Sequence, residues 1–209
     1  MPDDPLKNFR PSARTASVLI TMMREAQQRG AASMEVNDLI FALIAEDQAP
    51  NAPLLFDETP PGVLLLNEYL SRPTSDLEHE PFFSPRVAVT VLIKLNAIFP
   101  RSNRIPPDTS IPTSAALERV FRVAQNIPNE FHQNQVEIDS GTPNRPPRRY
   151  LAVVPLHLLA AALREPCEGT KMLQEAGITE GKVLQAIRAG GDLEKGDFHS
   201  EPSAPEKAQ

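Results

Sequence analysis

The sequence of 209 residues has no tryptophan, one cysteine and few aromatic residues, which make up 5% of the chain. A single cysteine, Cys167, excludes an internal disulfide framework and a zinc site built from several cysteines. Scarce aromatic side chains argue against the stacking platforms that bind sugars or single-stranded nucleic acid. The sequence also lacks the apolar run of about 18 residues that a membrane-spanning helix needs.

Basic residues are fewer than acidic ones, with 21 Lys and Arg against 27 Asp and Glu, so the net charge is -6. Phosphate binding begins with positive potential, so a nucleic-acid or anionic-membrane binder is not expected. The first ten residues carry two aspartates and lack the apolar core of a secretory signal. We therefore expect a soluble, cytoplasmic protein with no nucleic-acid or membrane partner.

Proline is abundant, with 22 residues, and it divides the chain into short segments. Apolar residues at helical spacing, preceded by capping residues and followed by Gly or Pro, predict an all-α protein. The predicted helices cover about 12–29, 35–46, 54–56, 63–70, 114–125, 155–165, 170–176 and 180–189.

The segment between residues 82 and 99 allows two interpretations. Ser84-Pro85 is typical of a helix start, and Pro100 of a stop. The apolar residues from Val87 to Leu95 alternate strictly, which is typical of a strand. We favour the helix because both of its ends carry the expected residues.

Self-comparison indicates an internal repeat. Ser12, Val18 and Leu19 match Ser114, Val120 and Phe121 at an offset of 102. Residues 39–46 match residues 158–165 at an offset of 119, because a longer loop precedes the second helix of the second copy. The chain therefore reads as two copies of a four-helix unit, although chance agreement between amphipathic helices would produce similar matches.

The second copy closely resembles the Clp N-terminal (Clp R) repeat, the double helical repeat at the front of Clp-type AAA+ unfoldases. The resemblance rests on His157 to Glu165, Gly169, Met172 to Ile178 and Val183 to Ile187. It covers about residues 11–70 and 111–187, and it is looser in the first copy. It implies a pseudo-twofold helical bundle that docks adaptor proteins and substrate segments.

The resemblance also implies a division of the chain. A polar, proline-rich insertion at 126–150 holds two short segments, 135–138 and 150–153, that could pair as a β-hairpin. The expected parts are an N-terminal arm at 1–10, a first repeat at 11–70, a proline-rich linker at 71–112, a second repeat at 113–189 and a disordered acidic tail at 190–209.

Some members of the family recognise phosphorylated arginine with a Thr at each first-helix start and a Glu just before the family's histidine. The matching positions here are Ser12 and Asn37 in the first repeat, and Ser114 and Leu156 in the second. Neither carboxylate is present, so no partner for a guanidinium group remains. Phosphoarginine binding is not carried over, and the four residues stay candidate partner-binding positions.

The sequence gives little support for a nucleotide site, a catalytic cysteine or a metal site. The string from Gly177 to Val183 is one residue short of a phosphate-binding loop and follows a helix, so we read it as a helix stop and restart. Cys167 and His157 could form a thiolate–imidazole pair, but continuous helix would separate them by about 15 Å. The four histidines show no metal-binding spacing, so neither a metal nor a cofactor is expected.

The sequence as a whole predicts a non-catalytic, stand-alone docking module that serves as adaptor or accessory protein to a Clp-type ATPase. Its partners would be that ATPase, another adaptor or a substrate peptide. The alternative is the same fold repurposed for a different regulatory or secretion partner. A small hydrolase using Cys167 and His157 is the remaining hypothesis.

Overall fold

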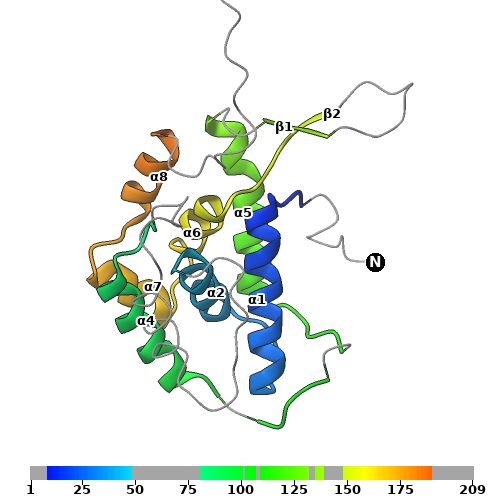
Figure 1. Ribbon diagram of the computed structural model, residues 1–209, viewed down its shortest axis with the longest axis vertical. Coiled ribbons are helices and arrows are strands. Elements are labelled where there is room, and N and C mark those ends of the chain that lie inside the picture. The colour runs from blue at the N-terminus through cyan, green and yellow to red at the C-terminus, as the bar shows by residue number, and fades with distance from the viewer. Residues whose placement is uncertain are drawn as a thin grey trace, which may run out of the picture.

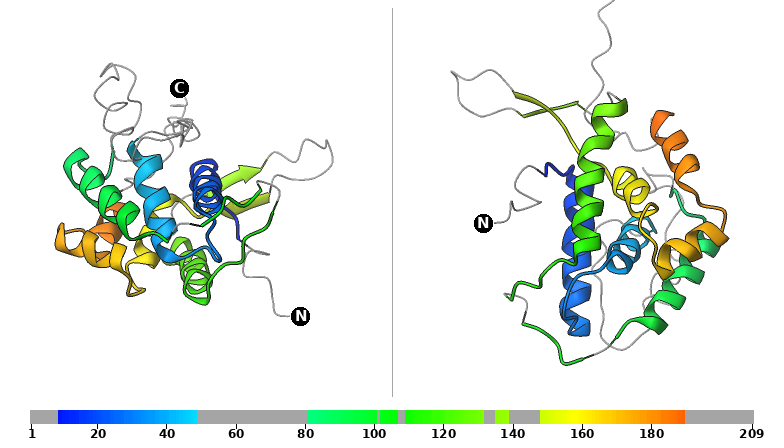
Figure 2. Two further views of the ribbon diagram at one scale, coloured as in Figure 1. Left: turned by 90° about the horizontal axis from the view of Figure 1, so that it is seen from below. Right: turned by 180° about the vertical axis from the view of Figure 1, so that it is seen from behind.

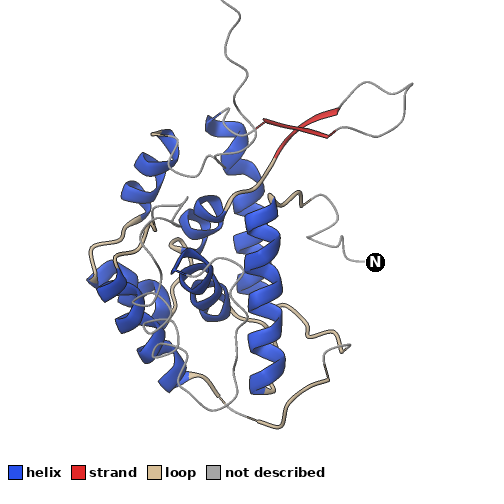
Figure 3. Cartoon of the chain, in the orientation of Figure 1, coloured by secondary structure: helices blue, strands red, loops and turns tan. Residues whose placement is uncertain are grey.

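The computed structural model describes residues 9–48, 81–100, 102–106, 109–131, 135–138 and 148–189 (Figure 1). In these ranges the chain is all-α apart from one short ribbon of two strands (Figure 3). The helices are α1 (Ala13–Arg29), α2 (Val36–Gln48), α4 (Pro85–Ile98), α5 (Ala115–Phe131), α6 (Pro155–Ala162), α7 (Glu168–Glu175) and α8 (Glu180–Arg188). The strands are β1 (Gln135–Ile138) and β2 (Arg148–Leu151).

The first helix of each repeat begins at the serine that the sequence indicated. The Oγ of Ser12 accepts a hydrogen bond from the backbone N–H of Thr15 at 3.2 Å, at the start of α1. The Oγ of Ser114 accepts in the same way from Leu117 at 3.3 Å, at the start of α5. Such caps satisfy amide groups that have no partner inside the helix.

The core is organised around α2 and α6, which pack against each other and against the first helices of both repeats (Figure 1). Both helices are buried along almost their whole length. Four side chains at their centre, Leu39, Ile40, Leu158 and Leu159, have at most 1% of their surface exposed. This central position explains why both segments are apolar on every face rather than amphipathic.

Two parallel β-bridges show that the halves of the chain are related by a pseudo-twofold exchange. Pro11 pairs with Val153, and Thr113 pairs with Met34. An offset of 102 takes Pro11 to Thr113, and an offset of 119 takes Met34 to Val153, so each bridge is the image of the other. The residues just before the first helix of each repeat therefore pair with the residues just before the second helix of the other repeat.

The hydrogen bonds of the two bridges repeat at the same offsets. Ser12 donates its N–H to the carbonyl of Val153 at 3.0 Å, and Ser114 donates to that of Met34 at 3.0 Å. Val153 and Met34 in turn each donate at 2.8 Å, to the carbonyls of Arg10 and Pro112. Chance similarity between amphipathic helices would not reproduce such long-range pairing, so the predicted tandem repeat is confirmed.

Residues 85–98 form helix α4, as favoured, and the alternative strand is wrong. The helix packs on α2 in the first half, as α8 packs on α6 in the second. This parallel favours α4 as the last helix of the first repeat rather than part of a linker. The predicted division of the chain stays untested, because the arm at 1–10, the segment 49–80 with its two expected short helices, and the tail at 190–209 lie outside the described residues.

Helix α5 is longer than the sequence predicted, and it continues through Pro128 to Phe131. The predicted insertion at 126–150 places Pro128 outside the helix, but Ile127 before it is only 1% exposed, and this burial favours continued helix. The strands β1 and β2 follow as an antiparallel ribbon in which Gln135 faces Leu151. The two segments pair as expected, although the second strand covers 148–151 rather than 150–153, and the ribbon extends away from the helices (Figure 2).

Candidate functional site

Each of the four positions suggested by the family resemblance has a structural role in this protein: two are buried, and two are half-buried and accept backbone hydrogen bonds. Ser12 is 6% exposed and caps α1, and Leu156 is 5% exposed and belongs to the core. Ser114 caps α5, and the Oδ1 of Asn37 accepts a hydrogen bond from the N–H of Gly169 at 2.9 Å. The pseudo-twofold bridges bring the Ser12 region to the start of α6 and the Ser114 region to the start of α2. A role for these residues in partner binding stays a prediction.

Asp38 and His157 occupy equivalent positions near the starts of α2 and α6. The Oδ2 of Asp38 accepts a hydrogen bond from the N–H of Glu35 at 2.7 Å, and the Nδ1 of His157 accepts from that of Val154 at 3.1 Å. The other Asp38 oxygen is paired with the guanidinium group of Arg29. Each side chain therefore performs the same capping task for its own repeat.

His157 is fully buried, and its Nε2 has no hydrogen-bond partner among the described residues. Burial lowers the pKa of its imidazole from 6.5 to about 4. A neutral ring that accepts at Nδ1 carries its proton on Nε2. His157 is consequently a neutral capping residue near pH 7, and a general base needs a pKa closer to that pH.

Cys167 likewise serves a helix start. Its Sγ accepts a hydrogen bond from the N–H of Thr170 at 3.5 Å, and the Oγ1 of Thr170 accepts one from the N–H of Cys167 at 3.0 Å. This reciprocal pair caps α7. No hydrogen bond joins Cys167 to His157 in the described structure, so the geometry gives a thiolate–imidazole pair no support.

The string that resembles a phosphate-binding loop is a helix stop and restart, as the sequence indicated. Gly177 takes a left-handed backbone with φ of 80° after the end of α7, and Thr179 precedes the first residue of α8. No three His, Cys, Asp or Glu side chains are grouped to hold a metal ion within the described ranges. None of the described helices is long and apolar enough to cross a membrane.

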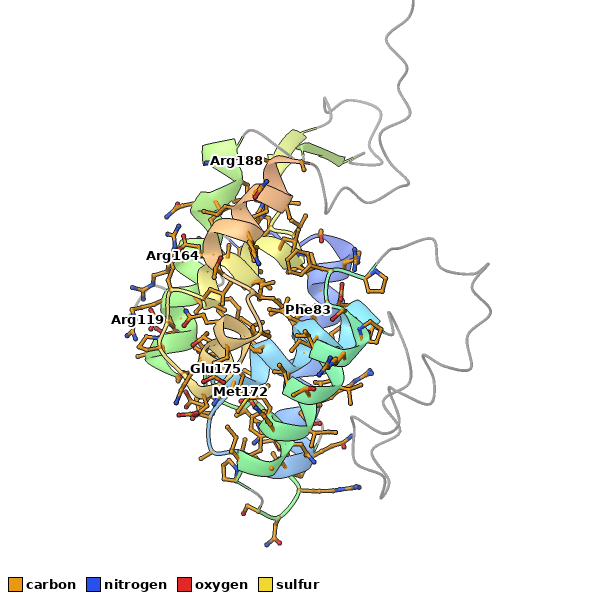
Figure 4. The ribbon with its side chains drawn as sticks, turned by 90° about the vertical axis from the view of Figure 1, so that its left-hand side faces the viewer. Phe83, Arg119, Arg164, Met172, Glu175 and Arg188 are labelled. Atoms are coloured by element: carbon orange, nitrogen blue, oxygen red, sulfur yellow. The ribbon has the colours of Figure 1, made fainter. Side chains whose placement is uncertain are left out.

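A groove of about 290 Å³ lies between α4 and α7, and we take it as the candidate functional site (Figure 4). Its floor is apolar and its rim is charged. The lining residues are Arg86, Val87, Thr90, Val91 and Lys94 from α4, and Met172, Glu175 and Ala176 from α7. In Figure 4, Met172 and Glu175 lie beside α4 on the face toward the viewer.

Both walls of the groove are attached to α2. At its C-terminal end, the two carboxylate oxygens of Asp47 accept hydrogen bonds from the N–H groups of Phe82 and Phe83, each at 2.9 Å, which holds the start of α4. At its N-terminal end, Asn37 accepts from Gly169 of α7. Because one helix positions both walls, the groove is preformed rather than created by a partner.

The groove differs in its charges from the neighbouring surface of the second repeat. There the guanidinium group of Arg119 binds Glu165 at 3.0 and 2.7 Å, and this pairing lowers the pKa of Glu165. Arg164 binds Glu180 at 2.7 Å. In contrast, no ion pair with a described residue involves Arg86 or Lys94, so both remain available to a ligand.

The groove does not follow from any motif in the sequence, although one signal was present. Helix α4 has apolar residues outside the face that packs against the core. Of these, Ile93 is 47% exposed and Ile98 is 46% exposed. A surface helix normally confines its apolar residues to one stripe. The α7 side of the groove had no such signal, because Met172 and Glu175 are ordinary residues of a short amphipathic helix.

Comparison with solved structures finds similarity to the N-terminal domain of the caseinolytic protease associated chaperone ClpD from Arabidopsis thaliana. The match has 14% sequence identity and a TM-score of 0.47, and it covers 91% of this chain and 98% of that one. No protein-family model matches the chain. No curated protein sequence matches it either.

Proposed function

We propose that this protein is a non-catalytic docking module that acts as a stand-alone adaptor or accessory protein of a Clp-type AAA+ ATPase in the cytoplasm. The observation that carries the docking function is the preformed groove between α4 and α7, with an apolar floor and two cations that lack described partners. Shallow surfaces of this kind suit a protein segment better than a small substrate, which needs a more enclosed pocket. The Clp-type partner comes from the sequence resemblance of the second repeat.

The states of the histidine and cysteine side chains that the hydrolase hypothesis needs support binding rather than catalysis. The buried His157 is neutral near pH 7, and Cys167 is engaged as a helix cap. The hydrolase hypothesis therefore has neither an activated nucleophile nor a base beside it.

The same fold serving another regulatory or secretion partner is the second candidate. One observation favours it, because Asn37 and Leu156 stand where phosphoarginine-binding members of the family have carboxylates, and here Asn37 is bonded to Gly169 and Leu156 is buried. A chain that has lost that recognition chemistry has room to bind a different partner. Identifying the protein that binds separates the two candidates.

The experiment is a binding titration against the purified Clp-type ATPase of the same organism. The chain, labelled at its N-terminus, is titrated with the ATPase ring in the presence of a non-hydrolysed ATP analogue, and fluorescence anisotropy is recorded. We expect saturable binding in the micromolar range, which corresponds to a binding free energy of about -8 kcal/mol. Absence of saturation with the ring and with its purified adaptors would contradict the Clp assignment.

A further inference from the structure

We infer that the α4–α7 groove binds an amphipathic helix of a partner protein, with an apolar anchor flanked by acidic side chains. This inference rests on the proposed docking function and specifies the chemistry of its site. The groove carries Arg86 and Lys94 on one wall and Glu175 on the other, so cations outnumber anions. An acidic segment complements that charge, whereas a basic one is repelled.

The positions of the two cations determine the spacing on the partner. Arg86 and Lys94 are eight residues apart on α4, which places them about 12 Å apart along the helix axis. Acidic residues seven or eight positions apart on a partner helix span the same distance. The apolar anchor then lies between them, over the floor formed by Val87, Val91 and Met172.

Comparison of the two repeats indicates that the fold does not require the exposed Ile93 of α4 to be apolar. The helices α4 and α8 can be aligned in sequence by the residue that precedes each, Ser84 and Thr179. In this alignment the buried Leu92 of α4 corresponds to the buried Ile187 of α8. In the same alignment the exposed Ile93 corresponds to Arg188. The second repeat packs with a charged residue where the first exposes an isoleucine, so Ile93 is available for binding.

The apolar surface also continues beyond the groove. Ile93 lies one turn after the lining residue Thr90, and Ile98 lies one turn after Lys94. Both are nearly half exposed, at 47% and 46%. A helix seated between α4 and α7 would cover this extension and so bury more apolar surface, which strengthens binding.

Other occupants fit less well. The groove of a second copy would carry the same excess of cations, so a symmetric pairing of two grooves would leave positive charge uncompensated. A nucleic acid would meet an apolar floor and the chain's net charge of -6.

The test uses two labelled helical peptides of 16 residues that share a Leu-Phe anchor. One carries Glu at two positions seven residues apart around the anchor, and the other carries Lys at the same positions. We expect the folded full-length chain to bind the Glu peptide at least about tenfold more tightly, as two partly exposed ion pairs together allow. Equal affinity for the two peptides overturns the inference.

The matched variants exchange charges inside and outside the groove. R86E/K94E should reverse the preference, so that the Lys peptide binds more tightly. R122E/K182E changes the net charge equally at two exposed positions outside the groove and should bind like the unaltered chain. Circular dichroism confirms that both variants are folded. A preference that R86E/K94E leaves unchanged, or a dimer that this variant dissociates, overturns the inference.

The two proposals fail separately. If the ATPase ring binds but the peptide preference is absent, the groove chemistry is wrong and the docking function stands. If the Glu peptide binds through Arg86 and Lys94 but no Clp component binds, the groove chemistry stands and the Clp assignment is wrong.

Discussion

His157 makes the stability of this protein depend on pH in a way that one substitution should remove. The imidazole is fully buried, and burial holds its pKa at about 4, against 6.5 for an ordinary histidine. In the unfolded chain the same side chain takes up a proton near pH 6.5. Acidification therefore protonates His157 in the unfolded state first.

The sign and size of the effect follow from this difference. Between about pH 6.5 and 4 the unfolded state binds more protons at this site than the folded state, so stability falls as the pH falls through that window. Each unit of pKa is about 1.4 kcal/mol. The loss due to His157 should reach about 2 kcal/mol at pH 5 and about 3 kcal/mol at pH 4.

The assay is urea unfolding of the unaltered chain and His157→Gln at several pH values between 7 and 4. Glutamine cannot titrate, yet it can still accept the hydrogen bond from Val154 near the start of α6. We expect the difference in unfolding free energy between the two proteins to change by about 3 kcal/mol across this range. Parallel curves, together with an NMR titration that places the folded-state pKa of His157 near 6.5, would refute the reasoning.

Two further predictions concern helix packing and capping around α7. Both Gly169 and Gly181 lie in helices, so alanine should gain about 1 kcal/mol of helix propensity at each. The added Cβ finds nothing within 4 Å at Gly181, but at Gly169 it would lie 2.9 Å from the Cδ1 of Ile40. Chemical denaturation should therefore show Gly181→Ala stabilised and Gly169→Ala destabilised by about 1–3 kcal/mol, and equal effects would contradict the close packing of α7 on α2. Cys167→Ser should leave the chain as stable or raise its unfolding free energy by up to about 1 kcal/mol, because a hydroxyl caps a helix better than a thiol; a clear loss of stability would argue against the capping role.

The sequence identified most of the described helices because helix formation is largely a local matter. Ser12 and Ser114 were predicted as helix starts from the residues around them, and both caps are present. The repeat could also be read from two offsets, since equivalent helices keep equivalent apolar positions. The local signal misled where tertiary packing opposed it, as at Pro128, which lies within α5 beside the buried Ile127.

The candidate site depended on contacts that no local pattern contains. The sequence pointed to Ser12, Asn37, Ser114 and Leu156, whereas the structure uses these residues for caps, for attaching α7 and for the core. Asn37 still bears on the site, because it holds the α7 wall of the groove.

The sequence by itself determined the helical class, the tandem repeat and the absence of a multi-cysteine framework, since these follow from periodicity, capping and composition. Only the tertiary structure decided that α4 and α7 stand side by side, which brings Arg86 and Glu175 to one groove although they are far apart in the chain. It also decided the pKa of His157, because burial depends on neighbours from the whole fold. Packing between distant segments creates both features, and a linear pattern does not record it.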